Sequence, residues 1–340
     1  MGIFRRSYLL IFLAVVGLIG LGILFFPAKK SDRIKDRIEI PTGSTFDQVL
    51  DTLDQNGFVS SRGIFSILAT LTGLKNDTPI AGSYLVDKQA SYFRIIRLLI
   101  SGRQTPVKLV LNNFRMAENL AGTLSQLLEP DSLAFLSLFR DSAALSSFNI
   151  DSANVLTLII PNTYEMYWTS SPKDFLERMS KESAKFWSEN ERLAKATALH
   201  LNTAQVYTLA SIVEKESNSK AERATIAGLY LNRLNIGMRL QADPTVVYAN
   251  QDFTIKRVYS GHLAKDSPYN TYLYAGLPPG PISMPSINSI DAVLNRENHQ
   301  YLYMCARPDN SGQHAFAETL KAHAVNANRY RQYLQDIGIL

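Results

Sequence analysis

With 340 residues, of which 46% are hydrophobic, the chain can build roughly two or three packed domains, which excludes a disordered protein. The formal net charge of +5 comes from the first 37 residues, where seven basic residues stand against two acidic ones. Because the remainder is neutral overall, the folded part lacks the basic excess that nucleic-acid binding requires. The single cysteine, Cys305, excludes an internal disulfide and a cysteine-rich metal site.

An uncharged stretch runs from Tyr8 to Phe26 and is followed by a polar, charged run that begins at Lys29. At about 1.5 Å per residue, a helix of this length spans the hydrocarbon core of a bilayer. The sequence therefore predicts a single-pass membrane anchor, with residues 1–37 forming a cytoplasmic tip, the anchor and a linker. A cleaved signal peptide is the alternative, although no small-x-small cleavage site follows. A count of flanking basic residues would place the C-terminal bulk inside, but long domains can translocate regardless of nearby charge.

A small α/β unit is predicted for residues 38–105. A strand at 38–40 leads into a helix, which begins where Thr45 and Gln48 form a capping box. A second helix and a returning strand at 83–86 complete a strand-helix-helix-strand order. The second helix is indicated by Ile64, Ile67, Leu68 and Leu71. The unit resembles the LysM-like subdomains of cell-wall proteins, and a generic α+β spacer is the alternative.

A larger α+β unit is predicted for residues 106–340. It begins with a strand at 107–111 and a helix through Leu120 and Leu124. One charged amphipathic helix is expected from Pro172 to Thr197. A polar break at residues 201–203 then caps a further helix, which carries the most informative chemistry of the chain.

The helix predicted at residues 203–217 carries two glutamates, Glu214 and Glu216, which point about 200° apart and cannot share a face. The residues stacked beneath Glu216 are aliphatic: Leu209, Ile212 and Val213. Those beneath Glu214 are Tyr207, Ala210 and Ser211. Burial against aliphatic side chains raises the pKa of a carboxyl group, as a general acid near neutral pH requires. The alternative is that Glu216 forms an ordinary ion pair with Lys220 one turn further on.

The segments at 221–249 and 267–282 are rich in amides, phenols, arginines and Gly-Pro turns. Amides offer hydrogen bonds to sugar hydroxyls, and flat aromatic rings offer faces for pyranose rings. This composition favours a groove that binds sugars beside the helix of Glu216.

Six motifs resemble one known family, and they occur in its order along the chain. They are PNTYEMY at 161–167, ASIVEKES at 210–217, LNRLNIGMRLQADPTVVYA at 231–249, YNTY at 269–272, GLPPGPI at 276–282 and HAF at 314–316. Over residues 38–340 the chain resembles the endolytic murein transglycosylases of the MltG/YceG family. The catalytic glutamate of that family is the second of the EKE pair, which implies that Glu216 is catalytic here. Glu216 and Ser217 also resemble the Glu-Ser pair of other lytic transglycosylases and goose-type lysozymes.

The resemblance implies an α+β protein with an N-terminal transmembrane helix, a small LysM-like α/β subdomain and a larger catalytic domain with an active-site cleft. It implies cleavage of peptidoglycan glycan strands between N-acetylmuramic acid and N-acetylglucosamine, leaving 1,6-anhydro ends, with no cofactor and no metal. The catalytic domain is expected on the periplasmic side of the inner membrane, with peptidoglycan synthases as candidate partners. The residues expected to line or shape the cleft are Asn232, Arg233, Gln241, Asp243, Tyr248, Asn270, Thr271 and Tyr272.

One departure from the family pattern is visible at residues 112–116, which read NNFRM where relatives tend to have a Glu-Gly turn. This segment is expected to lie in the non-catalytic half and to leave the cleft untouched.

Several alternatives remain open for the individual residues. Arg233 and Asp243 could form a structural ion pair, and Asp243, which precedes Pro244, could serve as an Asx-turn or helix cap. The tyrosines could be ordinary core aromatics. His314 and His323 are interpreted as loop histidines rather than metal ligands.

Two other functions also stay open from the sequence. A lysozyme-like muramidase that uses water would need a second carboxylate across the cleft, for which Asp243 and Glu222 are the nearest candidates. A non-catalytic peptidoglycan-binding protein is the third possibility, which the LysM-like portion alone would permit.

Overall fold

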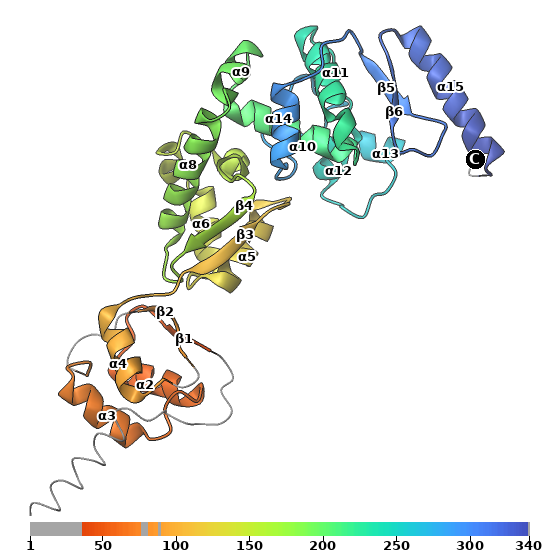
Figure 1. Cartoon of the computed structure of the whole chain (residues 1–340). Helices are drawn as coiled ribbons and strands as arrows, with labels where there is room; N and C mark the ends of the chain where they lie inside the picture. Colours follow the sequence, from red (N-terminus) through yellow and green to blue (C-terminus); the bar gives the residue numbers. More distant parts are fainter. Residues whose placement is uncertain (1–35, 76–80, 88–89, 339–340) are drawn as a thin grey trace, which may run out of the picture. The chain divides into compact units, whose positions relative to one another are not determined.

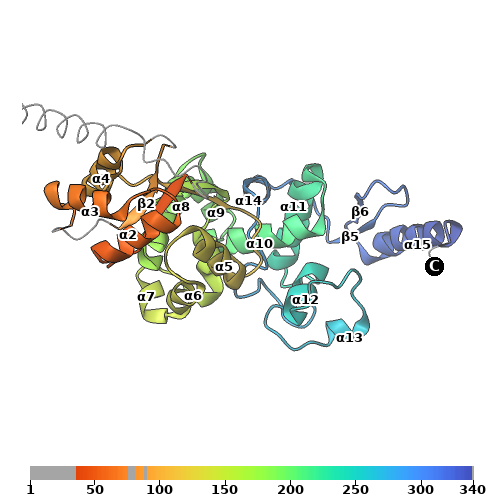
Figure 2. The same ribbon diagram turned by 90° about the horizontal axis from the view of Figure 1, so that it is seen from below.

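The computed structural model describes residues 36–75, 81–87 and 90–338, whose contacts define two compact units (Figures 1 and 2). The first unit comprises the chain up to Leu109 with the segments Ser125–Pro130 and Glu165–Ser171, and the second comprises the rest. The mixed α+β class is confirmed. None of the helices in the described part of the chain is long and apolar enough to cross a membrane. The predicted anchor at Tyr8–Phe26 lies outside the described residues.

The first unit has the predicted order of strands and helices. Its elements are β1 (Arg37–Ile40), α2 (Phe46–Gln55), α3 (Arg62–Leu71), β2 (Gly82–Leu85) and α4 (Tyr92–Ser101). Strands β1 and β2 pair antiparallel, with Ile38 opposite Tyr84. The capping box of Thr45 and Gln48 is present at the start of α2. The LysM-like identity of this unit stays a prediction.

Helix α3 lies where the sequence predicts the second helix. Phe65 and Ala69 are fully buried, whereas Ile67 and Leu71 are 62% and 77% exposed. The ring of Phe65 packs edge-on against Tyr92 of α4, with 5.6 Å between ring centroids. Ile64 and Leu68 pack partly buried against the same core, and the aromatic contact with α4 turns the Phe65 side of the helix inward.

The remaining elements follow in one run of mostly short helices. They are β3 (Val107–Leu111), α5 (Ala117–Leu127), α6 (Ser132–Arg140), α7 (Ser142–Ser146), η1 (Ser152–Leu158), β4 (Asn162–Met166), α8 (Pro172–Ser188), α9 (Arg192–Ala198), α10 (Thr203–Glu216), η2 (Lys220–Glu222), α11 (Arg223–Asn235), α12 (Asp243–Asn250), α13 (Ser260–Leu263), α14 (Ile287–Leu294), β5 (Tyr303–Ala306), β6 (His314–Ala317) and α15 (Leu320–Asp336). Strand β3 is hydrogen-bonded to β4, and β5 pairs antiparallel with β6. Helix α15 packs along the β5–β6 hairpin (Figure 1).

The single helix predicted from Pro172 to Thr197 is two helices in the structure. Helix α8 ends at Ser188 and α9 begins at Arg192, because Asn190 and Glu191 between them have positive φ angles of 54° and 60°. The break turns Arg192 into the interior. There its Nε donates to Asp291 of α14 over 2.8 Å, and its Nη1 donates to the carbonyl of Phe186 over 3.0 Å. A third bond runs from Nη2 of Arg192 to Oδ2 of Asp291 over 3.2 Å. A buried guanidinium with these three bonds is a tertiary reason for a break that helical periodicity does not show.

Helix α10 lies at the centre of the second unit, in contact with α9, α11, α12, α14 and η1 (Figure 1). Asn202 caps its start and forms a capping box with Gln205, as the polar break predicts. Eight consecutive residues, Val206–Val213, are buried, so the helix is enclosed on all sides until its last turn. That last turn carries Glu214 and Glu216.

Candidate active site

Glu216 ends α10 and has its carboxyl beside a buried phenol from the next helix. The hydroxyl of Tyr230, on α11, donates to Oε1 of Glu216 over 2.5 Å. Burial raises the pKa of Glu216 to about 7, against the lowering effect of the Tyr230 hydrogen bond. The negative charge of Asp243 adds to the rise, and the positive charge of Arg233 opposes it. A carboxyl group with this pKa holds a proton through much of the neutral range and can donate it.

Two pockets meet at Glu216. The first, here called the Arg115 pocket, has a volume of about 370 Å³ and is lined by Arg115, Lys215, Glu216, Asp243, Pro244, Val247, Tyr248, Phe253, Ile255, Lys256, Arg257, Val258 and Ile282. The second, here called the His314 pocket, has a volume of about 210 Å³ and is lined by Glu216, Tyr230, Arg233, Gln241, Asp243, Tyr272, Met304, Cys305, Ala306 and His314. Glu216 and Asp243 line both, so the two carboxyl groups stand at the border that the pockets share.

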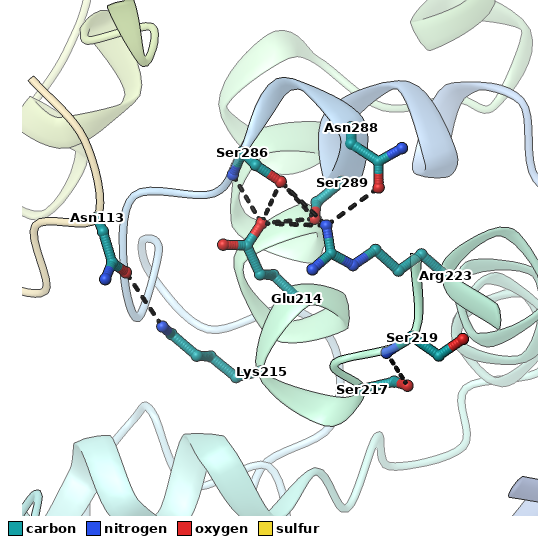
Figure 3. A network of polar contacts seen from close by, with 9 residues as sticks. All are labelled: Asn113, Glu214, Lys215, Ser217, Ser219, Arg223, Ser286, Asn288 and Ser289. Atoms are coloured by element: carbon teal, nitrogen blue, oxygen red, sulfur yellow. Dashed lines mark hydrogen bonds and ion pairs between the residues drawn. The ribbon is translucent and has the colours of Figure 1, made fainter. Parts of the chain in front are cut away.

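Glu214, two positions earlier, has the opposite environment (Figure 3). Its Oε2 accepts hydrogen bonds from the backbone N–H and hydroxyl of Ser286, at 2.7 and 2.5 Å, and from the hydroxyl of Ser289 at 2.6 Å. Arg223 lies 3.6 Å away. Although burial works to raise it, the pKa of Glu214 is lowered, because these hydrogen bonds and the Arg223 charge together outweigh desolvation.

Burial was expected to raise the pKa of Glu216, and burial is the largest cause of that rise. The faces of α10 alone do not separate the two glutamates. Because α10 is buried all round through Val213, both stripes are equally enclosed. The partners on α11 and α14 make the difference: four polar groups surround Glu214, whereas Glu216 receives one hydrogen bond, from Tyr230.

Five of the eight residues predicted to line or shape the cleft do line these pockets: Arg233, Gln241, Asp243, Tyr248 and Tyr272. The hydroxyl of Tyr272 donates to Oδ1 of Asp243 over 2.6 Å. Tyr248 forms a wall of the Arg115 pocket, with its ring 4.6 Å from that of Tyr269.

The other three lie behind the pocket walls and bind backbone. The amide of Asn232 donates to the carbonyls of His299 and Tyr301, at 2.8 and 3.1 Å. Asn270 is fully buried and donates to the carbonyls of Leu263, the last residue of α13, and of Lys265 in the loop that follows. The hydroxyl of Thr271 accepts from the backbone N–H of Ala242 over 3.0 Å. These contacts shape the loops that carry Gln241, Asp243 and Tyr272.

The structural alternatives for Arg233, Asp243 and Glu216 are not what the structure shows. Arg233 donates to the backbone carbonyls of Leu302 and Leu240 rather than to Asp243. Asp243 is the first residue of α12, its neighbour Ala242 is the N-cap, and its carboxylate accepts from Tyr272. Within the described residues, no ion pair joins Glu216 to Lys220.

The expectation that residues 112–116 leave the cleft untouched is wrong. Arg115 lines the Arg115 pocket, with its guanidinium 4.3 Å from the centre of the Phe253 ring. Asn113 accepts a hydrogen bond of 3.3 Å from Lys215, the residue before Glu216 (Figure 3). The segment therefore contributes Arg115 to the lining of this pocket.

Tyr230 was missed by the sequence reasoning, although a signal for it existed. Tyr230 and Arg233 are three positions apart on α11, so they share a face. The prediction that Arg233 lines the cleft therefore implies the same for Tyr230.

His314 begins strand β6 instead of lying in a loop. Its backbone N–H donates to Oε1 of Glu222 over 2.8 Å, and its Nδ1 lies 3.3 Å from Oε2 of the same residue. Glu222 also accepts from the hydroxyl of Ser217 over 3.2 Å and does not line either pocket. Its carboxylate fastens the end of α10 to the β5–β6 hairpin. In the described part of the chain no group of three or more His, Cys, Asp or Glu residues could hold a metal ion.

The comparisons with known proteins agree on one family. The YceG-like family model matches residues 38–329. An endolytic murein transglycosylase of Bacillus subtilis (strain 168) is 28% identical over 323 residues, which cover 90% of this chain and 88% of that protein. An endolytic murein transglycosylase of Streptococcus pneumoniae serotype 2 is 29% identical over 300 residues, covering 79% of this chain and 54% of that protein. The chain thus spans about half the length of the pneumococcal protein.

A solved structure is also similar. The 2.6 Å crystal structure of a yceG-like protein from Listeria monocytogenes matches with a TM-score of 0.55 and 28% sequence identity. The match covers 86% of this chain and 99% of that one.

Proposed function

Because this chain belongs to the YceG-like family, we propose that it is a peptidoglycan lytic transglycosylase that cleaves glycan strands between N-acetylmuramic acid and N-acetylglucosamine. The observation that carries the proposal is the place of Glu216. A carboxyl group with a pKa of about 7 lines two pockets, and we propose that each pocket takes one of the two sugars joined by the scissile bond. Space on both sides of the acid suits a cut within a strand.

In the proposed reaction, protonated Glu216 gives its proton to the glycosidic oxygen, and the bond between that oxygen and C1 of the muramoyl residue breaks. The N-acetylglucosamine leaves with a new hydroxyl, and positive charge develops at C1. The O6 hydroxyl of the same muramoyl residue attacks C1 and returns its proton to the Glu216 carboxylate. The product is a 1,6-anhydro end, no water is consumed, and Glu216 is protonated again.

Tyr230 and Asp243 support this acid in different ways. Tyr230 is a positioning residue, since its hydrogen bond fixes the carboxyl at the junction of the pockets. Asp243 acts through its charge, which disfavours the ionised form of Glu216 and so keeps the proton on it near neutrality. One carboxyl group therefore suffices as acid and base in turn.

Digestion of purified peptidoglycan by the wild type and Glu216→Gln tests this function. The wild type is expected to release fragments with 1,6-anhydro ends, detected by mass spectrometry, and the variant is expected to release none. Glu177→Gln on α8, where the side chain of Glu177 is 46% exposed, serves as the matched control and should retain activity. Equal release by the wild type and Glu216→Gln would overturn the assignment, and binding of strands without any release would favour the binding protein instead.

A water-using muramidase is the second candidate, and the position of Asp243 is the observation that favours it. Asp243 lines both pockets together with Glu216, so a second carboxylate is present in the cleft. The two reactions differ in their products, because hydrolysis adds one water and leaves a reducing end. Digestion in ¹⁸O-labelled water separates them: label at the new ends indicates hydrolysis, and unlabelled anhydro ends indicate transglycosylation.

We propose further that residues 8–26 anchor the protein in the inner membrane, with both folded units on the periplasmic side, where peptidoglycan lies. The support is the uncharged stretch and the charged residues that flank it. A short linker would keep the cleft close to newly made strands and to the synthases that make them. Protease treatment of spheroplasts tests the orientation: digestion of the folded part in intact spheroplasts supports it, and protection contradicts it.

A further inference from the structure

The Arg115 pocket is more basic than a site for neutral sugars requires. Its lining contains four basic side chains, Arg115, Lys215, Lys256 and Arg257, and two acidic ones, Glu216 and Asp243. Glu216, with a pKa of about 7, is protonated below neutral pH and then adds no negative charge. The pocket therefore carries a net positive charge next to the proposed acid.

Arg115 and Lys215 are the inner pair of these cations. Both are half-buried, whereas Lys256 and Arg257 are exposed. Arg115 lies over the face of the Phe253 ring, and Lys215 donates to the neutral amide of Asn113, so neither is neutralised by its neighbour. Among the residues that the structure describes, none of the four cations forms an ion pair.

Half-buried cations that are not neutralised by the protein are costly, because burial disfavours a charged group that lacks a counter-charge. Burial does lower the pKa of Lys215, in spite of the opposing attraction of Glu214. An anion bound in the pocket would supply the missing counter-charge. Planar carboxylates suit this position, since a guanidinium can bind them through two parallel hydrogen bonds.

We propose that Arg115 and Lys215 bind a carboxylate of the peptide carried by the muramoyl residue, and so select peptide-bearing strands. This inference rests on the proposed function, which places the muramoyl residue beside Glu216. The peptide is attached to that sugar, and its free carboxylates are the anions nearest to the scissile bond. Lys256 and Arg257 extend the positive potential outward along the pocket rim.

The test compares two substrates that differ in charge alone. One is native glycan strands, and the other is the same strands after carbodiimide coupling with ammonia, which converts the peptide carboxylates into neutral amides. For the wild type, kcat/KM for anhydro-end formation is expected to be about tenfold higher on the native strands, since one charge-assisted hydrogen-bond pair is of that order. For Arg115→Met and Lys215→Met, the ratio is expected to fall towards one.

Three controls keep the result decisive. Arg115→Lys and Lys215→Arg retain the charge and should keep most of the wild-type ratio. Lys181→Met removes an exposed lysine of α8 and should leave the ratio unchanged. An equal kcat/KM of the wild type on both substrates overturns the proposal, as does a methionine variant with the wild-type ratio. If the wild type forms no anhydro ends from either substrate, the proposed function fails. Co-sedimentation then compares the binding affinity of the protein for native and amidated strands, and this ratio tests the carboxylate site by itself.

Discussion

The phenolic hydroxyl of Tyr230 donates a hydrogen bond of 2.5 Å to Oε1 of Glu216, although the two residues lie on different helices. Tyr230 is 1% exposed and, like Glu216, lines the His314 pocket. A hydrogen bond of this kind favours the ionised carboxylate, whereas burial favours the protonated acid. The pKa of Glu216 is the balance of these two effects.

Tyr230→Phe should therefore raise the pKa of Glu216 above its value of about 7. The loss of one hydrogen bond to a charged group corresponds to roughly one pKa unit. Because the general acid works in its protonated form, the alkaline limb of the kcat/KM profile should move to higher pH by that amount. The reaction rate of the variant at low pH should also fall, since the carboxyl group of Glu216 loses the hydrogen bond that positions it. An alkaline limb that stays in place would contradict this account of the pKa.

Asp243→Asn should have the opposite effect on the same limb. The negative charge of Asp243 raises the pKa of Glu216, so its removal should lower that pKa and bring the alkaline limb to lower pH. Under lytic transglycosylation, activity measured well below the limb should be largely retained. Complete loss of activity at every pH, together with correct folding by circular dichroism, would instead support the muramidase.

Glu216→Gln should change the pH dependence of stability. The folded pKa of about 7 lies above the ordinary value of 4.5, so the stabilising protonated form is complete below the unfolded pKa and is lost as pH rises through the folded one. At 1.36 kcal/mol per pKa unit, the free energy of unfolding of the wild type should fall by up to about 3 kcal/mol between pH 4 and pH 8. The neutral glutamine variant should not show this fall. Urea unfolding at the two pH values measures the free energy of unfolding. An equal change with pH in both proteins would refute the prediction.

Glu214→Gln should destabilise the protein without moving the alkaline limb of the activity profile. The carboxylate of Glu214 holds the start of α14 through Ser286 and Ser289, and loss of its charge should cost about 2 kcal/mol at neutral pH. Its folded pKa is lowered, so this contribution is present above the unfolded pKa of 4.5 and disappears as pH falls through the folded one. Thermal unfolding at pH 7 and pH 3 checks this, with Glu177→Gln expected to stay within about 0.5 kcal/mol.

Local signals in the sequence were sufficient to predict several elements. The capping boxes at Thr45 and Asn202 involve residues three positions apart, so they can be identified in any short window. The strands β1 and β2 and the bounds of α10 also follow from local alternation and polar breaks. Glu216 could be selected for the same reason, since the motif around it is contiguous.

Contacts between distant segments could not be predicted in this way. The inward turn at Arg192 depends on Asp291, 99 positions later in the chain. The face that α3 buries depends on Tyr92 of α4. Likewise, Arg115 is assigned to the cleft only by the folded chain, because no periodicity relates it to Phe253. Helical spacing gives the direction in which a side chain points, but not what it meets there.

The final turn of α10 carries two acids that must be in different protonation states for the protein to work, Glu214 ionised and Glu216 protonated. At low pH, Glu214 becomes protonated and holds α14 less strongly. At high pH, Glu216 loses the proton that it has to donate. The pH range in which the protein works is thus limited at low pH by Glu214 and at high pH by Glu216, two residues of one helix whose surroundings differ. Substitution of Tyr230 or Asp243 would shift the upper limit of this pH range. The lower limit would stay unchanged, because it depends on the contacts of Glu214 with Ser286, Ser289 and Arg223.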